Sequence, residues 1–188
     1  MRKVILFEHV TLDGFVAGPN GEMDWITIDQ NMFDFVNERT KLSNAAMYGR
    51  KTWQMMDGYW PEAGKNPKAS KHDIEHSKWY NNIDKYVLSN TIKSDPSKKV
   101  HVIGKDLVNE VNRIKNGPGN EILIFGSPGA GHSLQKHDLI DGYWLFLNPV
   151  TLGKGISLYS GVKDKTKFKL DNTHTFDNGV ICLSYSRV

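Results

Sequence analysis

The chain has 188 residues, of which 39% are hydrophobic, and 24 basic residues stand against 21 acidic ones. A chain of this length can bury roughly 70% of its unfolded surface around one core, so we expect a single domain over residues 1–188. The net charge of +3 is weak support for nucleic-acid binding, and no stretch approaches the roughly 20 apolar residues of a membrane helix. The lone Cys182 cannot form an internal disulfide. We therefore expect a soluble cytoplasmic protein that binds neither nucleic acid nor membrane.

In the first half of the chain, short β-rich runs alternate with helical stretches. Val4–Val10 is expected to be the first strand, and the apolar run ends at Glu8 and His9, too early for a signal peptide. Thr27–Gln30 has the form of a capping box, which predicts that a helix starts there. A short strand at 45–48 should lead into a second helix at 49–56, and the Pro- and Gly-containing segment 58–70 is predicted to be an irregular loop.

In the second half, further strands are expected at residues 85–89, 99–103, 121–125 and 143–147, with a helix at 107–114. The last two runs, 166–174 and 180–185, are joined through Asp177-Asn178-Gly179 and should pair antiparallel. Lysines alternate at positions 163, 165, 167 and 169, which predicts one solvent-facing side of an edge strand. The pattern indicates an α/β fold with a mostly parallel, three-layer sheet and an antiparallel C-terminal strand pair.

A glycine-rich run at residues 125–133 lies between a predicted buried strand and a predicted helix. Glycines let the backbone approach a phosphate, and the N–H groups of a helix start attract its charge. The run has every element of a Walker A loop except the lysine, which is replaced by His132, and its glycine spacing is not that of a Rossmann loop. It is as compatible with a plain glycine turn as with a phosphate site. A P-loop-like nucleotide-binding module is therefore one alternative function.

His72 and His76 have the i, i+4 spacing of a pair of metal ligands. They are not part of an HExxH motif and no third ligand is evident, so we predict no metal site. We expect these two histidines to lie on a solvated helix face.

Several segments in order resemble the dihydrofolate reductase superfamily, especially its branch related to the riboflavin-biosynthesis reductase domain. They span nearly the whole chain and are the T-L-D-G-F-V-A-G loop at 11–18, Y-G-R-K-T-W at 48–53, L-S-N-T at 88–91, the glycines of 124–131, and L-N-P-V-T-L-G-K-G at 147–155. The resemblance implies a reductase that uses NADPH to transfer a hydride to a small heterocyclic substrate, pteridine-like or of the 5-amino-6-(5-phosphoribosylamino)uracil reductase type. It also implies a homodimer.

The resemblance implies cofactor contacts at Ala17, Gly18, Gly49, Arg50, Lys51, Thr52, Ser89, Asn90, Gly126, Ser127, Gly129, Ala130 and Gly131. Asn90 stands where the family has the arginine that contacts the adenosine 2'-phosphate, so NADH is also possible. Phe15 stands where the riboflavin branch has a lysine, which leaves the substrate open. A family member that binds cofactor without catalysis is a further alternative.

The candidate proton donors are Asp13 and Asp29, with Asp34 as a further candidate, and the candidate substrate-stacking residues are Trp25, Phe33 and Trp53. Each has a structural alternative. Asp13 could fix its turn with Gly14, Asp29 could favour a helix dipole, and aromatic residues at helical spacing are common in protein cores.

Overall fold

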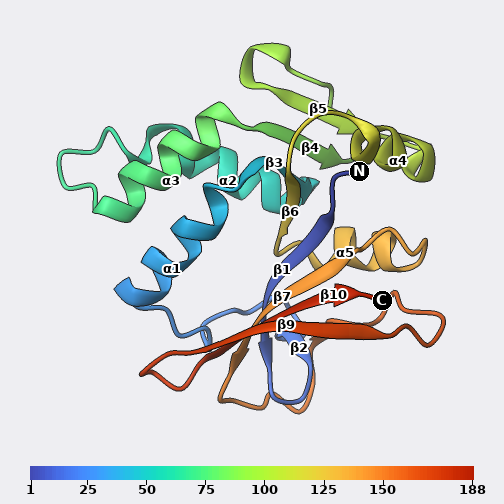
Figure 1. Cartoon of the computed structure of the whole chain (residues 1–188). Coiled ribbons are helices and arrows are strands. Elements are labelled where there is room, and N and C mark those ends of the chain that lie inside the picture. Colours follow the sequence, from blue (N-terminus) through green and yellow to red (C-terminus); the bar gives the residue numbers. More distant parts are fainter. The chain divides into compact units, whose positions relative to one another are not determined.

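The computed structural model describes all 188 residues, and its chain packs into two compact units. The first unit comprises residues 1–2 and 30–123, and the second comprises residues 3–29 and 124–188. In Figure 1 the chain thus passes from the second unit into the first and returns at strand β6 (Glu121–Phe125), which is divided between them. No helix is long and apolar enough to cross a membrane. The predicted single domain stays a prediction.

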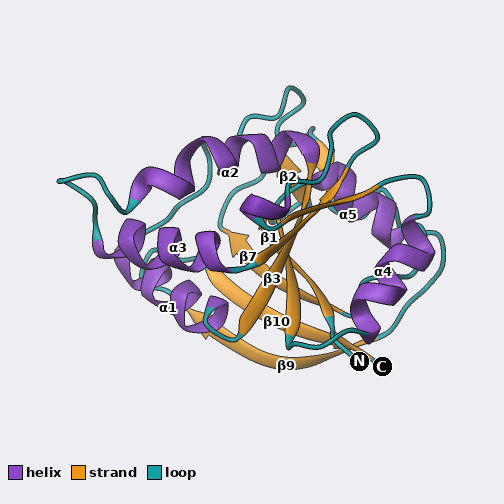
Figure 2. Ribbon diagram, turned by 90° about the horizontal axis from the view of Figure 1, so that it is seen from above, coloured by secondary structure: helices purple, strands orange, loops and turns teal.

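The first unit has an α/β architecture. Its parallel strands are ordered β5-β4-β3 and have the bounds β3 (Ser43–Gly49), β4 (Asp84–Leu88) and β5 (Val100–Ile103). Its helices are α1 (Gln30–Thr40), α2 (Arg50–Ala63), α3 (Lys71–Asn82), the short 3-10 helix η1 (Pro96–Lys98) and α4 (Leu107–Asn116). Helices α1, α2 and α3 lie on one side of these strands and α4 on the other, which makes three layers (Figure 2).

The second unit contains the strand order β1-β7-β10-β9. These strands are β1 (Val4–Thr11), β7 (Gly142–Asn148), β9 (Phe168–Thr175) and β10 (Ile181–Arg187). Strand β1 is parallel to β7, whereas β7–β10 and β10–β9 are antiparallel. Helix α5 (Pro128–Gln135) follows β6, and β2 (Phe15–Ala17) pairs separately with β8 (Ile156–Ser157). The predicted fold class and its antiparallel C-terminal pair are confirmed.

One side of β1 and β7 is held together by aromatic rings. Phe7 lies 4.9 Å from Phe125, 4.8 Å from Trp144 and 5.0 Å from Phe146, measured between ring centroids. All four side chains are buried, and the lone Cys182 is buried as well. Rings at these separations add attraction beyond the burial of their apolar area, so this cluster fixes the strands that carry the neighbouring loops.

Helix α2 extends to Ala63, so the irregular loop predicted from residue 58 is wrong over its first part. Pro61 lies inside the helix, near its end, and its missing N–H removes one helical hydrogen bond. Packing on α3 explains the extension. Gly64 packs closely on α3, since a Cβ added at Gly64 would lie 3.0 Å from the side chain of Ser77. The centroids of the Trp60 and His76 rings are 4.0 Å apart. Tertiary contacts here override local propensity.

The predicted solvated face of His72 and His76 is also wrong. Each residue is only 7% exposed, and His72 stacks on Phe33 at 3.9 Å. Burial lowers the pKa of His76 to about 3. The two imidazoles are neutral members of an aromatic core between α1, α2 and α3.

Two further predictions fail at the ends of elements. Helix α1 begins at Gln30, whose amide donates to Asp34, while the Thr27 N–H donates to Asn148, so the capping box does not form. Strand β9 begins at Phe168, so three of the four alternating lysines lie in the loop before it. A side-chain pattern alone does not fix where pairing starts.

Candidate functional site

Asp13 joins two sequence motifs that lie far apart in the chain. Its carboxylate accepts a hydrogen bond from the Thr11 hydroxyl at 2.6 Å and from the N–H of Gly153 at 2.7 Å and of Leu152 at 3.1 Å. These bonds, that of Thr11 first, hold the pKa of Asp13 below its ordinary value. The carboxylate is therefore ionised at neutral pH and fixes the turn after β1 to the loop before β8.

The same two loops also touch along their backbones. A Cβ at Gly155 would lie 2.3 Å from the carbonyl oxygen of Ala17, and Leu12 N–H donates to Val150 at 2.8 Å. Gly18 is buried against the Glu22 side chain and donates its N–H to the Glu22 carbonyl. The predicted nicotinamide loop at Ala17 and Gly18 is thus held in one conformation by the second motif.

The glycine-rich run forms a sharp turn between β6 and α5. Gly126 and Ser127 both have positive φ, +51° and 63°, and a Cβ at Gly129 would meet nothing within 4 Å. The first turn of α5 contains no acidic residue, and Ser127 makes no side-chain cap. The N–H groups of Gly129 and Ala130 belong to the helix start, where no helical acceptor is available. This end of α5 suits an anion such as a phosphate.

A second helix start of the same kind lies at Gly49. It is the N-cap of α2 and makes no side-chain cap, and the first turn contains Arg50, Lys51 and Thr52 but no acidic residue. Lys51 is exposed, and Arg50 donates to Gln54 at 3.3 Å. The N–H groups of the first helical turn and two cations at one helix start favour an anion there.

Ser89 and Asn90 follow β4 directly. The Ser89 hydroxyl accepts from Thr91 N–H at 3.1 Å, which shapes a small polar turn. A Cβ at Gly104, after β5, would lie 3.7 Å from Asn90 Oδ1, so the ends of both strands lie side by side. Asn90 and Lys105 are exposed at this edge.

The three predicted stacking residues differ in their surroundings. Trp25 is half-buried and donates its ring N–H to the Glu22 carbonyl at 3.3 Å, and Trp53 is half-buried on α2. One face of Phe33 is covered by His72. This contact favours a packing role for Phe33, and the ligand roles of all three stay predictions.

Asp29, the other predicted proton donor, is half-buried and accepts from Asn178 at 2.7 Å. Nearby, fully buried Asn148 accepts from Thr27 N–H and donates to the Phe146 carbonyl. These two asparagines fix the segment before α1. Asn148 stands in the L-N-P-V motif, but its role was not evident from the sequence.

Glu8 is an acidic residue on β1 that was not among the predicted site residues. It is 7% exposed, and burial raises its pKa to about 8. A Cβ added at Gly126 would lie 3.8 Å from Oε1 of Glu8. The only sequence signal was a single carboxylate inside an otherwise apolar strand.

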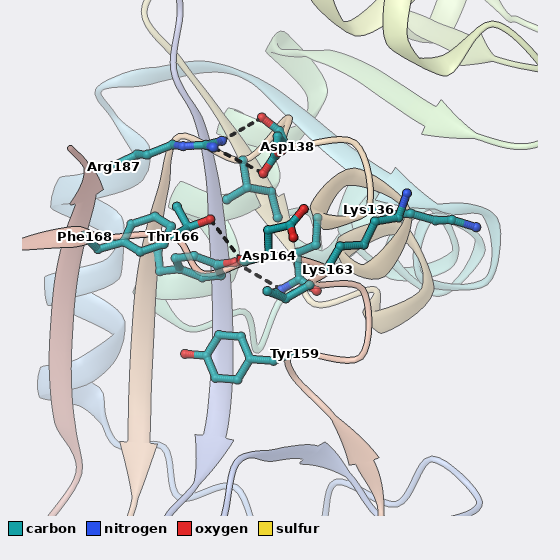
Figure 3. Close-up of a pocket in the computed structure, with 12 residues that line it drawn as sticks. Lys136, Asp138, Tyr159, Lys163, Asp164, Thr166, Phe168 and Arg187 are labelled. Atoms are coloured by element: carbon teal, nitrogen blue, oxygen red, sulfur yellow. Dashed lines mark hydrogen bonds and ion pairs between the residues drawn. The ribbon is translucent and has the colours of Figure 1, made fainter.

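A cavity of about 300 Å³ lies elsewhere in the second unit, near the amino ends of β7 and β9 (Figure 3). Its wall includes Arg187, which donates to the Asp138 carbonyl at 3.1 Å and pairs with its carboxylate at 3.2 Å. Tyr143, Tyr159 and Phe168 add aromatic surface. No predicted site residue lines this cavity, because the predicted loops follow the carboxyl ends of β1 and β6.

Solved structures with this architecture define a class of reductase-like folds. A dihydrofolate reductase from Enterococcus faecalis, complexed with NADP(H) and RAB-propyl, has a TM-score of 0.63 at 16% identity and covers 98% of this chain and 96% of its own. A bifunctional deaminase and 5-amino-6-(5-phosphoribosylamino)uracil reductase from Thermotoga maritima has a TM-score of 0.66 at 20% identity and covers all of this chain, which spans 57% of it. These likenesses concern the fold.

Within this class, residues 2–182 match the RibD C-terminal domain family, and the chain belongs to that family. The uncharacterized protein YyaP of Bacillus subtilis (strain 168) is 34% identical over 188 residues, which cover 98% of this chain and 94% of the relative. YwjB of the same organism, also uncharacterized, is 26% identical over 184 residues and 95% of each chain.

Proposed function

We propose that this protein is an NADPH-dependent reductase of a small heterocyclic substrate, either pteridine-like or of the 5-amino-6-(5-phosphoribosylamino)uracil type. The observation that carries the proposal is the start of α5, where the N–H groups of Gly129 and Ala130 have no helical acceptor and the first turn has no acidic residue. A dinucleotide presents several phosphates, and such helix starts recognise phosphate. Membership of the RibD C-terminal domain family supports the same class of reaction.

The donor set fits a phosphorylated cofactor. Gly129 and Ala130 would hold a phosphate by their backbone N–H groups, within a turn shaped by Gly126, Ser127 and Gly131, since the N–H groups of Gly126 and Gly131 donate to the carbonyls of Phe7 and Ser127. From the resemblance, Gly49, Arg50, Lys51 and Thr52 would also contact the cofactor. Ala17 and Gly18 would lie beside the nicotinamide. When bound, a reduced nicotinamide supplies a hydride.

Ser89 and Asn90 would lie beside the adenosine ribose. Because Asn90 carries no charge, exposed Lys105 and Lys51 are left to neutralise a 2'-phosphate. From the resemblance we also expect a homodimer that acts in the cytoplasm.

The alternative P-loop-like module is disfavoured by the position of His132. Its Nε2 lies 2.7 Å from the Ser157 carbonyl, so the ring is engaged with β8. A side chain so placed does not take the role of the Walker A lysine.

Isothermal titration with NADPH, NADH and magnesium-ATP tests the proposal. We expect NADPH to bind, with a dissociation constant in the micromolar range or about −8 kcal/mol. Gly129→Asp places a negative charge at the start of α5 and should abolish binding, whereas Gly58→Ala, inside α2, should leave it unchanged. Binding of ATP without NADPH would contradict the reductase and favour the nucleotide-binding module.

A further inference from the structure

Glu8 faces the α5 side of the β1–β7 strand pair. Alternate strand residues share a face, and Leu6, two residues before Glu8, lies against Gly131 of α5. Gly126 leaves room above the carboxyl group, since a Cβ there would come within 3.8 Å of Oε1. The Glu8 side chain therefore lies beneath the glycine turn that leads into α5.

The Glu8 carboxyl group has no partner within the protein. It makes no hydrogen bond or ion pair, and no charged group contributes to its pKa, which burial alone raises to about 8. Although the residue is 93% buried, its oxygens are not among the fully enclosed polar atoms. A buried acid with an open hydrogen-bonding position is costly to stability, so a ligand that uses it is the natural counterpart.

The aspartates predicted as proton donors have partners within the protein. Asp13 is held as an anion by three donors, and an anion has no proton to give. Asp29 accepts from Asn178, and Asp34 accepts from Gln30 and pairs with Lys71. Glu8, by contrast, keeps its proton at neutral pH, the state that a general acid requires.

We propose that Glu8 is the proton donor of the reduction, acting beneath the glycine turn at Gly126; this rests on the proposed reductase function. As hydride reaches the carbon of a C=N or C=O bond of the substrate, the electron pair of that bond moves to its nitrogen or oxygen. That atom takes the proton of Glu8, so the carboxyl O–H bond breaks and a new N–H or O–H bond forms. The Glu8 carboxylate then recovers a proton from water. The substrate is reduced by two electrons and the nicotinamide is oxidised by two.

The protonation state of Glu8 can be measured without turnover. Infrared difference spectra of the ligand-free protein should show a protonated-carboxyl band at pH 7 that disappears as pH rises through about 8. The band should be absent from Glu8→Gln and present in the control Glu110→Gln, which changes an acid paired with Arg113 on α4. A wild-type spectrum without this band at pH 7 would overturn the proposal.

Turnover then separates this role from cofactor binding. Among pteridine and aminouracil substrates, we use the one that the wild-type protein reduces fastest with NADPH. Glu8→Gln should bind NADPH with unchanged affinity and lose turnover by about 100-fold or more, and Glu8→Leu should do the same. Wild-type turnover should also fall above pH 8, where Glu8 loses its proton, and the pH–rate profile of Glu8→Gln should not show this fall. Undiminished turnover by Glu8→Gln would overturn the role of Glu8 alone, whereas absence of NADPH binding to wild type would remove the proposed function itself.

Discussion

At the scale of single residues, the Asp13 carboxylate links the first loop to the loop at Leu152 and Gly153 by accepting hydrogen bonds from both of their N–H groups. Asp13→Ala leaves both N–H groups without their acceptor, so we expect faster amide hydrogen exchange at these two positions. The loop beside the nicotinamide loses its fixed position, and NADPH-dependent turnover should fall by about 10- to 100-fold. Asp24→Ala, an exposed change in the same loop, is the control. Unchanged amide hydrogen exchange at Leu152 and Gly153 would show that the Asp13 carboxylate is not needed to hold the two loops together.

A second prediction concerns Asn90 and the preference for NADPH over NADH. Asn90→Arg places a planar cation at the exposed edge after β4, where it can pair with a 2'-phosphate in two parallel hydrogen bonds. We expect the ratio of NADH to NADPH dissociation constants to rise by about tenfold, or about 1.4 kcal/mol. Calorimetric titration of both cofactors measures it, with Asn81→Arg on α3 as the control. An equal gain for NADH would mean that the new charge contacts the pyrophosphate instead.

At the scale of elements, the β2–β8 pair depends on the absence of a side chain at residue 155. Gly155→Ala forces a Cβ to within 2.3 Å of the Ala17 carbonyl, so the two strands must separate. We expect a loss of about 1–3 kcal/mol in the free energy of unfolding, measured by urea denaturation. Gly58→Ala is the matched control, because its Cβ would meet nothing within 4 Å and alanine favours the helix, which should raise stability slightly. Equal effects of both changes would contradict this account.

The elements also show what local sequence can and cannot predict. The continuous apolar run of β6 and the antiparallel end of the sheet were predictable, because period and turn chemistry are local signals. The full length of α2 was not, since contacts with α3 outweigh the effect of Pro61. Likewise, the sequence around His72 and His76 predicts a solvent-exposed helix face. These histidines are core residues because the rings of Phe33 and Trp60 pack against them.

For the candidate site, the ordered motifs predicted the two glycine-led helix starts, because glycine and charge at a helix start are visible in sequence. The contact between Asp13 and Gly153 was not predictable, since it depends on a return of the chain about 140 positions later. Glu8 was missed because its significance lies in its burial, and burial follows from tertiary packing.

At the scale of the whole molecule, buried His76, His9 and Glu8 shape the dependence of stability on pH between about pH 4 and pH 8. Burial lowers the pKa of His76 to about 3 and of His9 to about 4, both from 6.5, and raises that of Glu8 from 4.5 to about 8. Below pH 6.5 the unfolded chain binds protons that the folded histidines exclude, so stability falls as pH falls. Between pH 4.5 and 8 the unfolded chain releases a proton that folded Glu8 retains, so this group makes stability fall as pH rises.

We therefore expect the free energy of unfolding to be greatest near pH 6.5, where the histidine contribution is complete and the loss from Glu8 continues alone. Each group changes stability by at most about 1.4 kcal/mol per pH unit. Urea denaturation from pH 4 to pH 8, below the range in which buried Lys85 titrates, measures the curve. Glu8→Gln should flatten it above pH 6.5 and leave the acid side unchanged; a decline above pH 6.5 that survives in this variant would point to other groups.

The pairing of β1 with β7 and the bond from Leu12 to Val150 also constrain how the protein is made. The first loop leaves the ribosome early, but the strand and the turn that shape it are synthesised only after most of the chain has emerged. Contacts of such long sequence separation form late and slow folding. The nascent chain must therefore keep the β7 edge of the apolar strand β1 unpaired until residues 142–148 are available, and during this interval that edge is exposed to aggregation and to chaperones.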